Sequence, residues 1–421
     1  MFIGSDAIAL APMTDRIAFL DDGDVASISR DRADVFDADG NPAVREVRAT
    51  HLTGAAIGKA GHRHYMHKEI YEQPAVAGDR LRSLIDPETK RIVMPFLAAD
   101  FTKVTKVSIV ACGTSYYSGC VARYWIEDLA QVTCDVEVAS EFRYRRPYLP
   151  KGGVAIFISQ SGETADTLAA MEHAKAQGQI CISLVNVPSS SMARLAHATL
   201  RTYAGPEIGV ASTKAFTSQL IAMACLVLHI AHARGTIDPA RETELTEALL
   251  TAPNLMADAL LCEPDVQEAA AFLADADHAL YLARGTLFPL AMEGALKLKE
   301  VSYIHAEGYA AGEMKHGPIA LIDEKMPIVV LAPSDPWFEK SASNIAEVRA
   351  RKGRVLAISD AKGMKELDDY VDVGLTLPAS HPFIAPIVLA VPLQLLAYHA
   401  AVLRGTDVDQ PRNLAKSVTV E

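Results

Sequence analysis

The chain has 421 residues, of which half are hydrophobic and 22% are charged, so it is long enough for two or three globular domains. Its net charge of −12 disfavours nucleic acid and anionic membranes as partners, because both require basic surfaces. The start carries no signal-peptide pattern, and no uninterrupted apolar stretch approaches the ~18 residues of a membrane-spanning helix. The sequence therefore predicts a soluble cytoplasmic protein.

The six cysteines show no C-x-x-C spacing, so neither a zinc ribbon nor a thioredoxin-like motif is indicated. Most lie in apolar strings, which favours buried reduced thiols. These cysteines are Cys112, Cys120, Cys134, Cys181, Cys225 and Cys262.

Residues 1–50 are typical of β-structure. The string "RIAFLDDGDVASIS" (16–29) predicts a hairpin around an Asp-Gly turn, and "DVFDADGNPAVREVRAT" (34–50) predicts a second. Two hairpins alone are marginally stable in water, so we interpret this segment as the remnant of a larger domain.

Residues 51–75 are polar, and we predict a linker there. The segment contains His62, His64 and His67, which invite a metal-site interpretation. No cysteine or paired carboxylate accompanies them, so linker structure is favoured over a metal site.

From about residue 100 the pattern changes to alternating strands and helices. Apolar strands such as "KVSIVA" (106–111) and "GVAIFIS" (153–159) are separated by helical segments, which predicts a parallel sheet covered on both faces. A long apolar helix at 214–234 closes this first domain, which we place at residues 76–240.

The same series recurs further along the chain. A strand again ends in Gly-Thr before a helix, and Glu141 and Glu313 follow Gly113 and Gly285 at the same distance. We therefore predict an α/β fold with two tandem doubly wound parallel-sheet domains, 76–240 and 255–405, followed by a C-terminal tail, 406–421.

Two turns of the first domain are rich in hydroxyl groups. "CGTS" (112–115) and "SQSGETADT" (159–167) each follow a strand and precede a helix, where ligands bind in doubly wound sheets. Helix N-termini bind anions, so the pair predicts a phosphate site, and ordinary helix capping is the alternative. No P-loop or G-x-G-x-x-G motif supports a nucleotide.

The string "AMEGALKLKE" places Glu293, Lys297 and Glu300 on one helical face. One interpretation is a solvated stripe with a Glu-to-Lys pair worth ~0.2–0.5 kcal/mol. The other is a cleft wall, in which burial would raise the pKa of Glu300 and suit it to proton transfer. His316, in a Lys-His-Gly-Pro turn, is either structural or a proton-transfer group for sugar ring opening.

These motifs closely resemble those of the glutamine–fructose-6-phosphate aminotransferase family, also called glucosamine-6-phosphate synthases. The resemblance covers essentially the whole chain and rests on "CGTSYYSG", "ASEFRYR", "SQSGETADT", "GVASTKAFT", "EGALKLKEVSYIHAEGYAAGEMKHGP" and "DVDQPRNLAKSVTVE". It implies two sugar isomerase (SIS) domains, preceded at residues 1–70 by the end of a glutaminase domain and a linker.

The chain departs from the family at its start. The family's glutaminase has a nucleophilic cysteine directly after the initiator methionine, whereas Phe2 stands here and the first cysteine is Cys112. We therefore expect no glutamine hydrolysis, and ammonia would come from a separate source or a glutaminase partner.

The resemblance also implies substrate contacts. The phosphate of fructose-6-phosphate would be held by the two turns, and the sugar would be bordered by three further residues. The turn residues are Gly113, Thr114, Ser115, Ser159, Gln160, Ser161 and Thr164, and the bordering residues are Cys112, Val210 and Ala415.

Four residues carry the chemistry that the resemblance implies. Glu300 would move the proton between C1 and C2, and Lys297 would support the enediol charge. His316 would assist ring opening from the other subunit of a homodimer. Lys416 would form a Schiff base with the C2 carbonyl, giving glucosamine-6-phosphate for amino-sugar biosynthesis without a metal or organic cofactor.

Two alternatives remain open from the residues. A non-catalytic SIS-domain sugar-phosphate sensor would need the phosphate turns but not Glu300, His316 and Lys416 together. A deaminase or simple isomerase of the same fold is disfavoured by the C-terminal string.

Overall fold

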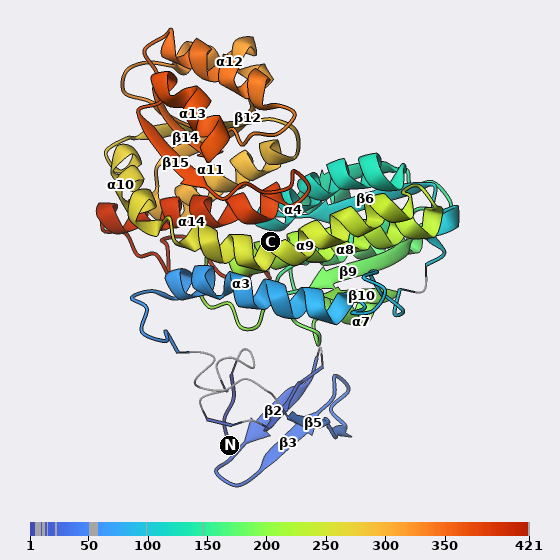
Figure 1. The fold of residues 1–421 in the computed structure, drawn as a ribbon. Helices are drawn as coiled ribbons and strands as arrows, with labels where there is room; N and C mark the ends of the chain where they lie inside the picture. Colours follow the sequence, from blue (N-terminus) through green and yellow to red (C-terminus); the bar gives the residue numbers. More distant parts are fainter. Residues whose placement is uncertain are drawn as a thin grey trace. The chain divides into compact units, whose positions relative to one another are not determined.

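The computed structural model describes residues 1–4, 10, 13–14, 16–21, 23–49, 58–97, 99–145 and 147–419. The chain divides into two compact units, Met1–Arg63 and His64–Glu421 (Figure 1).

The described residues of the first unit form two small antiparallel sheets. Strands β2 (Val25–Ile28), β3 (Ala33–Phe36) and β4 (Pro42–Ala43) form one, and β1 (Arg16–Ala18) pairs with β5 (Val47–Ala49) in the other. The predicted hairpin at 34–50 is confirmed by the pairing of β3 with β4.

The predicted hairpin at 16–29 is wrong, because β1 pairs with β5 and not with β2. A salt bridge accompanies the different pairing. The carboxylate of Asp24, in the predicted turn, accepts a 2.6 Å hydrogen bond from Nη2 of Arg45, between β4 and β5. The turn pattern at residues 21–24 gives no information about Arg45, which lies 21 residues further along the chain.

The second unit contains two parallel five-stranded sheets. The first has the order β10-β9-β8-β6-β7 and the second β12-β11-β13-β14-β15. The sheets share one strand order when the two halves of the chain are aligned, which confirms the predicted tandem fold. The first sheet comprises β6 (Lys106–Ala111), β7 (Thr133–Val138), β8 (Val154–Ser159), β9 (Ile180–Val185) and β10 (Ala198–Arg201). The second comprises β11 (His278–Ala283), β12 (His305–Ala310), β13 (Pro327–Leu331), β14 (Arg354–Asp360) and β15 (Val373–Leu377).

The central strands of both sheets are buried on both faces, as their uniformly apolar sequences predicted. Alternate residues of β6 enter different hydrophobic clusters, with Ile109 on one face and Val110 on the other. Tyr281 and Leu282 of β11 divide in the same way. The covering helices of the first sheet are α4 (Gly113–Trp125), the π-helix η2 (Ile126–Ala130), α5 (Ala139–Arg145), α6 (Ala165–Ala176) and α7 (Ser191–Leu195). The second sheet carries η3 (Gly285–Leu287), α11 (Phe288–Ser302), η4 (Ala311–His316), η5 (Pro318–Leu321), α12 (Phe338–Arg349), α13 (Ala361–Leu367) and η6 (Asp368–Tyr370).

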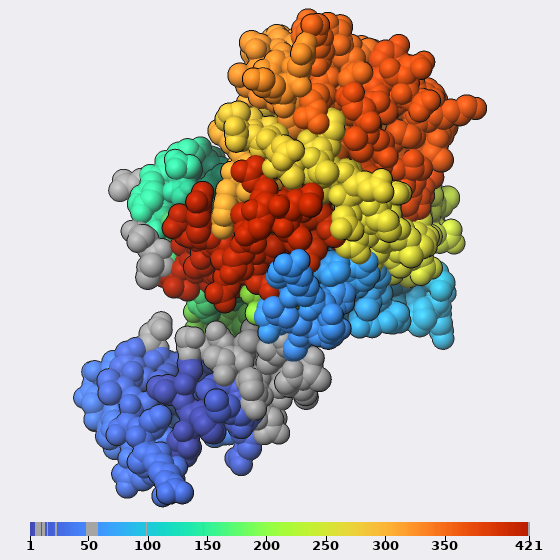
Figure 2. All heavy atoms as spheres, turned by 90° about the vertical axis from the view of Figure 1, so that its left-hand side faces the viewer, coloured from blue at the N-terminus to red at the C-terminus, as the bar shows by residue number. Residues whose placement is uncertain are grey.

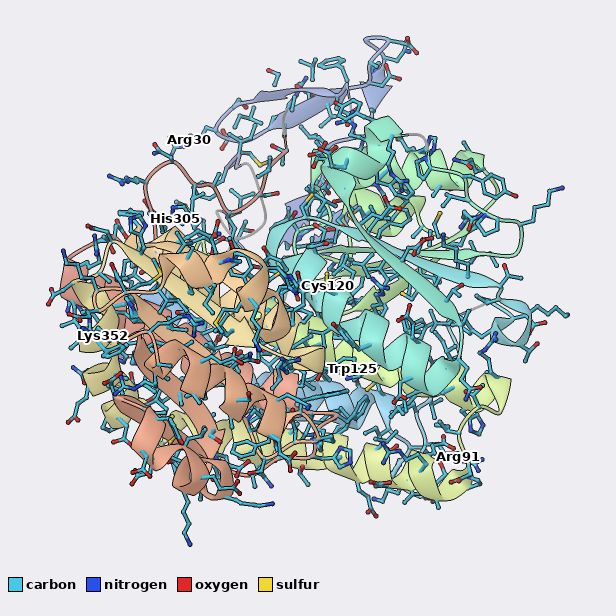
Figure 3. The ribbon with its side chains drawn as sticks, turned by 90° about the horizontal axis from the view of Figure 1, so that it is seen from above. Arg30, Arg91, Cys120, Trp125, His305 and Lys352 are labelled. Atoms are coloured by element: carbon cyan, nitrogen blue, oxygen red, sulfur yellow. The ribbon has the colours of Figure 1, made fainter. Side chains whose placement is uncertain are left out.

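A set of long helices joins the two sheets. The long helices α8, α9 and α14 lie beside α3 in Figure 1, and α10 packs on α14. Trp125 at the end of α4, labelled in Figure 3, packs on Phe383 with ring centroids 5.2 Å apart. The set comprises α3 (Tyr65–Leu84), α8 (Lys214–Arg234), α9 (Pro239–Leu260), α10 (Glu263–Ala274) and α14 (Ala385–Arg404).

Helices α8 and α14 are long and apolar enough to cross a membrane by composition alone. In each, 89% of the most apolar window is buried within the protein, so both are core helices.

Helix α3 corrects the predicted linker, because it begins at Tyr65. Met66, Ile70 and Ala77 are buried on one side of it, at helical spacing within an otherwise polar segment. His64 Nδ1 lies 3.0 Å from the hydroxyl of Tyr398, and His67 Nε2 lies 2.8 Å from Oε1 of Glu263. The described residues contain no group of three or more His, Cys, Asp or Glu side chains arranged to hold a metal ion.

Candidate active site

The candidate site lies where the strand order of the first sheet reverses. From β6 the chain goes to β7 on one side and then returns to β8 on the other, so the strand order reverses between the carboxyl ends of β6 and β8. Doubly wound sheets bind their ligands at such a position, which we call the β6/β8 crevice. The two predicted hydroxyl-rich turns begin at these strand ends. Gly113 has φ +52°, a left-handed conformation that suits glycine.

The turn after β8 is organised by its own hydroxyl groups. Ser159 Oγ lies 2.9 Å from Thr164 Oγ1 and accepts a 3.0 Å hydrogen bond from the Gly162 N–H. Ser161 Oγ accepts from the Glu163 N–H at 3.1 Å. Thr164 is the N-cap residue of α6 but makes no side-chain capping bond, so simple capping does not account for its hydroxyl.

Three more of the predicted substrate contacts lie in these two turns, namely Gln160 and Ser115 for the phosphate and Cys112 for the sugar. Gln160 is half-buried in the second turn, and Cys112, before α4, is half-buried with its thiol pKa raised by burial. Ser115 Oγ accepts a 2.9 Å hydrogen bond from Nε2 of Gln219 on α8.

The polar face of α11 is buried against the first domain. Lys297 Nζ donates to Thr114 Oγ1 at 2.9 Å and lies 3.4 Å from Glu293 Oε1 and 2.5 Å from Glu300 Oε2. The Thr114 hydroxyl also donates to Glu293 Oε1 at 3.1 Å. Glu293 and Lys297 are each only 1% exposed, so the solvated-stripe interpretation is wrong. That interpretation assumed a helix face in contact with water, but this face of α11 packs against α4.

Burial governs the charges in this cluster. It raises the pKa of Glu293 to about 8, against the opposing effect of the Lys297 ammonium. Burial alone would lower the pKa of Lys297, but the carboxylates of Glu293 and Glu300 outweigh it and raise that pKa above the usual lysine value. The deeply buried acid is thus Glu293, whereas the Glu300 side chain remains 20% exposed.

Lys416 is held by a buried acid that the sequence did not single out. Its Nζ donates to Glu207 Oε2 at 2.5 Å and to the Gly209 carbonyl at 2.8 Å. Glu207 Oε1 also accepts from the backbone N–H groups of Thr213 and Ala215, each at 2.9 Å. Burial raises the pKa of Glu207, but Lys416 and these donors outweigh it and hold the pKa below its usual value.

The C-terminal tail lies across the second hydroxyl-rich turn. Ser417 Oγ is 3.0 Å from Ser161 Oγ, and the Val418 carbonyl accepts from the Ala165 N–H at 3.2 Å. The predicted sugar-bordering residues are close by in sequence. Val210 follows Gly209, and Ala415 precedes Lys416 and is exposed.

His316 stands apart from this group. It lies at the end of η4 and is exposed, and no hydrogen bond or ion pair joins it to the site residues within the described part of the chain.

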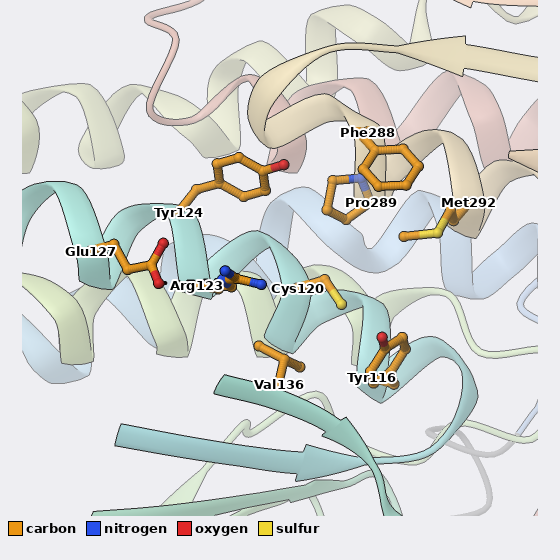
Figure 4. A pocket seen from close by; sticks show the side chains of 9 residues that line it. All are labelled: Tyr116, Cys120, Arg123, Tyr124, Glu127, Val136, Phe288, Pro289 and Met292. Atoms are coloured by element: carbon orange, nitrogen blue, oxygen red, sulfur yellow. Dashed lines mark hydrogen bonds and ion pairs between the residues drawn. The ribbon is translucent and has the colours of Figure 1, made fainter. Parts of the chain in front are cut away.

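A separate pocket of about 360 Å³ lies between α4 and the start of α11 (Figure 4). None of the predicted site residues line it, and burial raises the pKa of its Cys120 thiol to about 11. The lining residues are Tyr116, Cys120, Arg123, Tyr124, Glu127, Val136, Phe288, Pro289 and Met292.

Comparison with known proteins places this site in a family. The SIS domain model matches residues 100–229 and 272–404. A glutamine–fructose-6-phosphate aminotransferase [isomerizing] from Zymomonas mobilis is 54% identical over 420 residues, covering 100% of this chain and 69% of the relative. The chain belongs to the glutamine–fructose-6-phosphate aminotransferase family. The resemblance deduced from its motifs is therefore confirmed.

Solved structures agree with this family assignment. The C-terminal domain of the Francisella tularensis glucosamine-fructose-6-phosphate aminotransferase has a TM-score of 0.80 and 44% identity, covering 84% of this chain and 100% of that one. A Thermotoga maritima glucosamine-6-phosphate deaminase shares the fold at 22% identity, with a TM-score of 0.67, covering 84% of this chain and 99% of that one.

Proposed function

We propose that this member of the aminotransferase family binds fructose-6-phosphate at the β6/β8 crevice and converts it, with ammonia, to glucosamine-6-phosphate. The observation that carries the proposal is the meeting of three elements at one strand-order reversal. The first element is the pair of hydroxyl-rich turns. The second is the buried face of α11 with Glu293, Lys297 and Glu300, where Lys297 donates a hydrogen bond to Thr114 of the first turn. The third is the tail with Lys416, which contacts the second turn through the Ser417 and Ser161 hydroxyl groups. A sugar-phosphate sensor would need only the first of these elements.

The phosphate binds to the turn hydroxyls and to the N-termini of α4 and α6. Backbone N–H groups and the helix dipole favour an anion at these positions. Ser161 and Thr164 lie at the start of α6, and Ser115 lies in the first turn of α4. The tail then covers the sugar and excludes water from the C2 carbonyl.

Lys416 attacks the C2 carbonyl as a neutral amine, and water leaves as the imine forms. Glu207, 2.5 Å from Nζ, is the carboxylate placed to receive the ammonium proton. Ammonia then adds to C2 and displaces the Lys416 amine, so the bond to the enzyme breaks as the C2 imine of ammonia forms. Glu300 carries a proton from C1 to C2, while the Lys297 ammonium stabilises the enaminol intermediate, or the enediol when no ammonia is supplied. With ammonia, the sum is fructose-6-phosphate plus ammonia giving glucosamine-6-phosphate plus water. The overall oxidation level is unchanged, so no redox cofactor is required.

His316 completes the proposed site from a second subunit. Its exposed position at the end of η4 suits donation across a homodimer interface to assist ring opening. We further propose a cytoplasmic location for the protein.

The direct test is incubation of the protein with fructose-6-phosphate and ammonium salt, with glucosamine-6-phosphate measured by mass spectrometry. We expect product with ammonia. Saturable binding of fructose-6-phosphate with neither amination nor isomerisation would favour the sensor.

A further inference from the structure

Helix α3 lies outside the residues matched by the SIS model, yet one of its side chains reaches the Lys416 site. Glu69 is 1% exposed, and its Oε1 accepts hydrogen bonds from the backbone N–H groups of Ile208 at 2.5 Å and Gly209 at 3.2 Å. A buried carboxyl group with two backbone donors fixes the loop that supplies them.

That loop is also the loop that holds Lys416. The side chain of Glu207 and the carbonyl of Gly209 both accept hydrogen bonds from Nζ. Within residues 207–209, Glu69 therefore holds the backbone of Ile208 and Gly209, while Glu207 and Gly209 hold the lysine. The loop also lies close to α3, since a Cβ at Gly209 would lie 2.9 Å from Glu69 Oε2 and 3.4 Å from Met66 N.

The root of the tail is attached to the same helix. The Asp409 carboxylate accepts from the N–H groups of Tyr65 at 2.9 Å and Met66 at 3.0 Å, which are the first two residues of α3. The Asp409 carbonyl accepts from the Val210 N–H at 3.0 Å. Figure 2 shows the C-terminal residues, in red, on the surface beside α3, in light blue. Helix α3 thus contacts both the tail and the loop that the tail lysine contacts.

We propose that Glu69 is a positioning residue for Lys416, acting through the 207–209 loop to hold the amine where it meets the sugar carbonyl. The inference rests on the proposed imine chemistry of Lys416. It assigns to α3 a part of the active site that the SIS domains alone do not supply.

The charges around Glu69 determine which substitution is informative. Burial, with the adjacent Glu207 carboxylate, raises the pKa of Glu69 to about 8, against the opposing ammonium groups of Lys416 and Lys214. Lys214 is itself paired with Glu72 at 2.6 Å, and Asp409 lies at the start of the same helix. At pH 7 the Glu69 carboxyl group is therefore largely neutral, so glutamine reproduces its charge and its acceptor oxygen.

The test compares Glu69→Ala and Glu69→Gln in the full chain, with Glu72→Gln as the matched control one turn further along α3. The readouts are the rate of borohydride trapping of fructose-6-phosphate on Lys416 and the affinity for the sugar phosphate. At pH 7 we expect Glu69→Ala to slow trapping about tenfold or more, as for the loss of one or two hydrogen bonds, with affinity changed less than about threefold. Glu69→Gln and Glu72→Gln should trap within about threefold of the unmodified chain.

The pH dependence provides a readout that a purely structural role would not change. Above about pH 8 the trapping rates of the unmodified chain and of Glu69→Gln should diverge. The Glu69 carboxyl group loses its proton in that range, whereas a glutamine side chain at this position cannot ionise. Coincident pH profiles, or a Glu69→Ala variant that binds sugar and traps at the normal rate, would overturn the inference. If Glu69→Ala does not fold, the Glu69→Gln profile alone decides. Failure of the unmodified chain to trap would instead overturn the proposed imine chemistry.

Discussion

The two strand-order reversals of the second unit have the same topology and different contents. At β6/β8 the turns present hydroxyl groups and are crossed by the tail. At β11/β13, Gly285 corresponds to Gly113 and is covered by Trp337. A Cβ added at Gly285 would lie 2.7 Å from Nε1 of that tryptophan. Asp360 there accepts hydrogen bonds from Ser334 N at 2.6 Å and Ser334 Oγ at 2.8 Å. A carboxylate thus occupies the donors that an anionic ligand would use.

The second copy contributes a helix to the first copy's crevice. Helix α11 follows β11 as α4 follows β6, and its polar face contacts Thr114 of the first domain. Of the two copies, the first presents the hydroxyl-rich turns and the second supplies the buried carboxyl and ammonium groups. Strand order alone therefore does not locate a site, because the side chains of the turns determine what the crevice can bind.

The largest expected effect is at the tail, which crosses only the first crevice. Lys416→Arg should abolish borohydride trapping with fructose-6-phosphate, because a guanidinium stays protonated and cannot attack a carbonyl. Truncation before Asp407 should do the same and leave the two SIS domains folded. Mass spectrometry of the trapped protein checks this. If the adduct is on Lys297, or if a chain that binds the sugar forms no adduct, Lys416 is not the nucleophile and the tail only covers the site.

The second-largest effect is expected at Glu300, which lies on α11 of the second domain. Glu300→Gln should leave trapping on Lys416 intact and lower the isomerisation of fructose-6-phosphate by about 10²–10⁴-fold, since it removes the proton-transfer group but not the amine. Solvent-hydrogen exchange at C1 and C2, followed by NMR, measures the proton transfer. Normal exchange in this variant would assign the step to another residue, of which Glu293 is the nearest buried acid.

The turns themselves provide a matched comparison. Ser161→Ala and Thr164→Ala should each weaken sugar-phosphate binding by about 1.5–3 kcal/mol, roughly ten- to a hundredfold, because each removes a hydroxyl bond to a charged group. Ser334→Ala, at the corresponding turn of the second domain, should leave the affinity unchanged. Isothermal titration compares the three variants. Equal losses at both turns would mean that the two crevices do not differ as described.

The smallest effect concerns stability against pH. The pKa of Glu293 is raised to about 8 by burial, so the folded chain binds this proton more tightly than the unfolded chain. The associated stability is complete below the ordinary glutamate value of 4.5 and is lost as pH rises toward 8. Glu293→Gln cannot ionise, so its melting temperature should fall less over that range. Parallel pH profiles of melting temperature would show that Glu293 does not titrate there.

Features that lie within consecutive residues could be predicted from the amino-acid sequence. Uniformly apolar strands predicted sheets buried on both faces, and the repeated Gly-Thr turns revealed the duplication, because each of these signals lies within one strand–turn–helix segment. The motifs around Ser161, Lys297 and Lys416 were sufficient to identify the family, since each is a continuous string.

Contacts between residues far apart in the sequence became known only from the folded structure. Three contacts join segments that are far apart in sequence. They are the pairing of β1 with β5, the hydrogen bond from Lys416 to Glu207, and the hydrogen bond from the Ile208 N–H to Glu69 of α3. The sequence also could not distinguish a solvated Glu293–Lys297 pair from a buried one, because helical spacing fixes which residues share a face but not what covers that face. The packing of α11 against α4 excludes water, and this burial raises the pKa of Glu293.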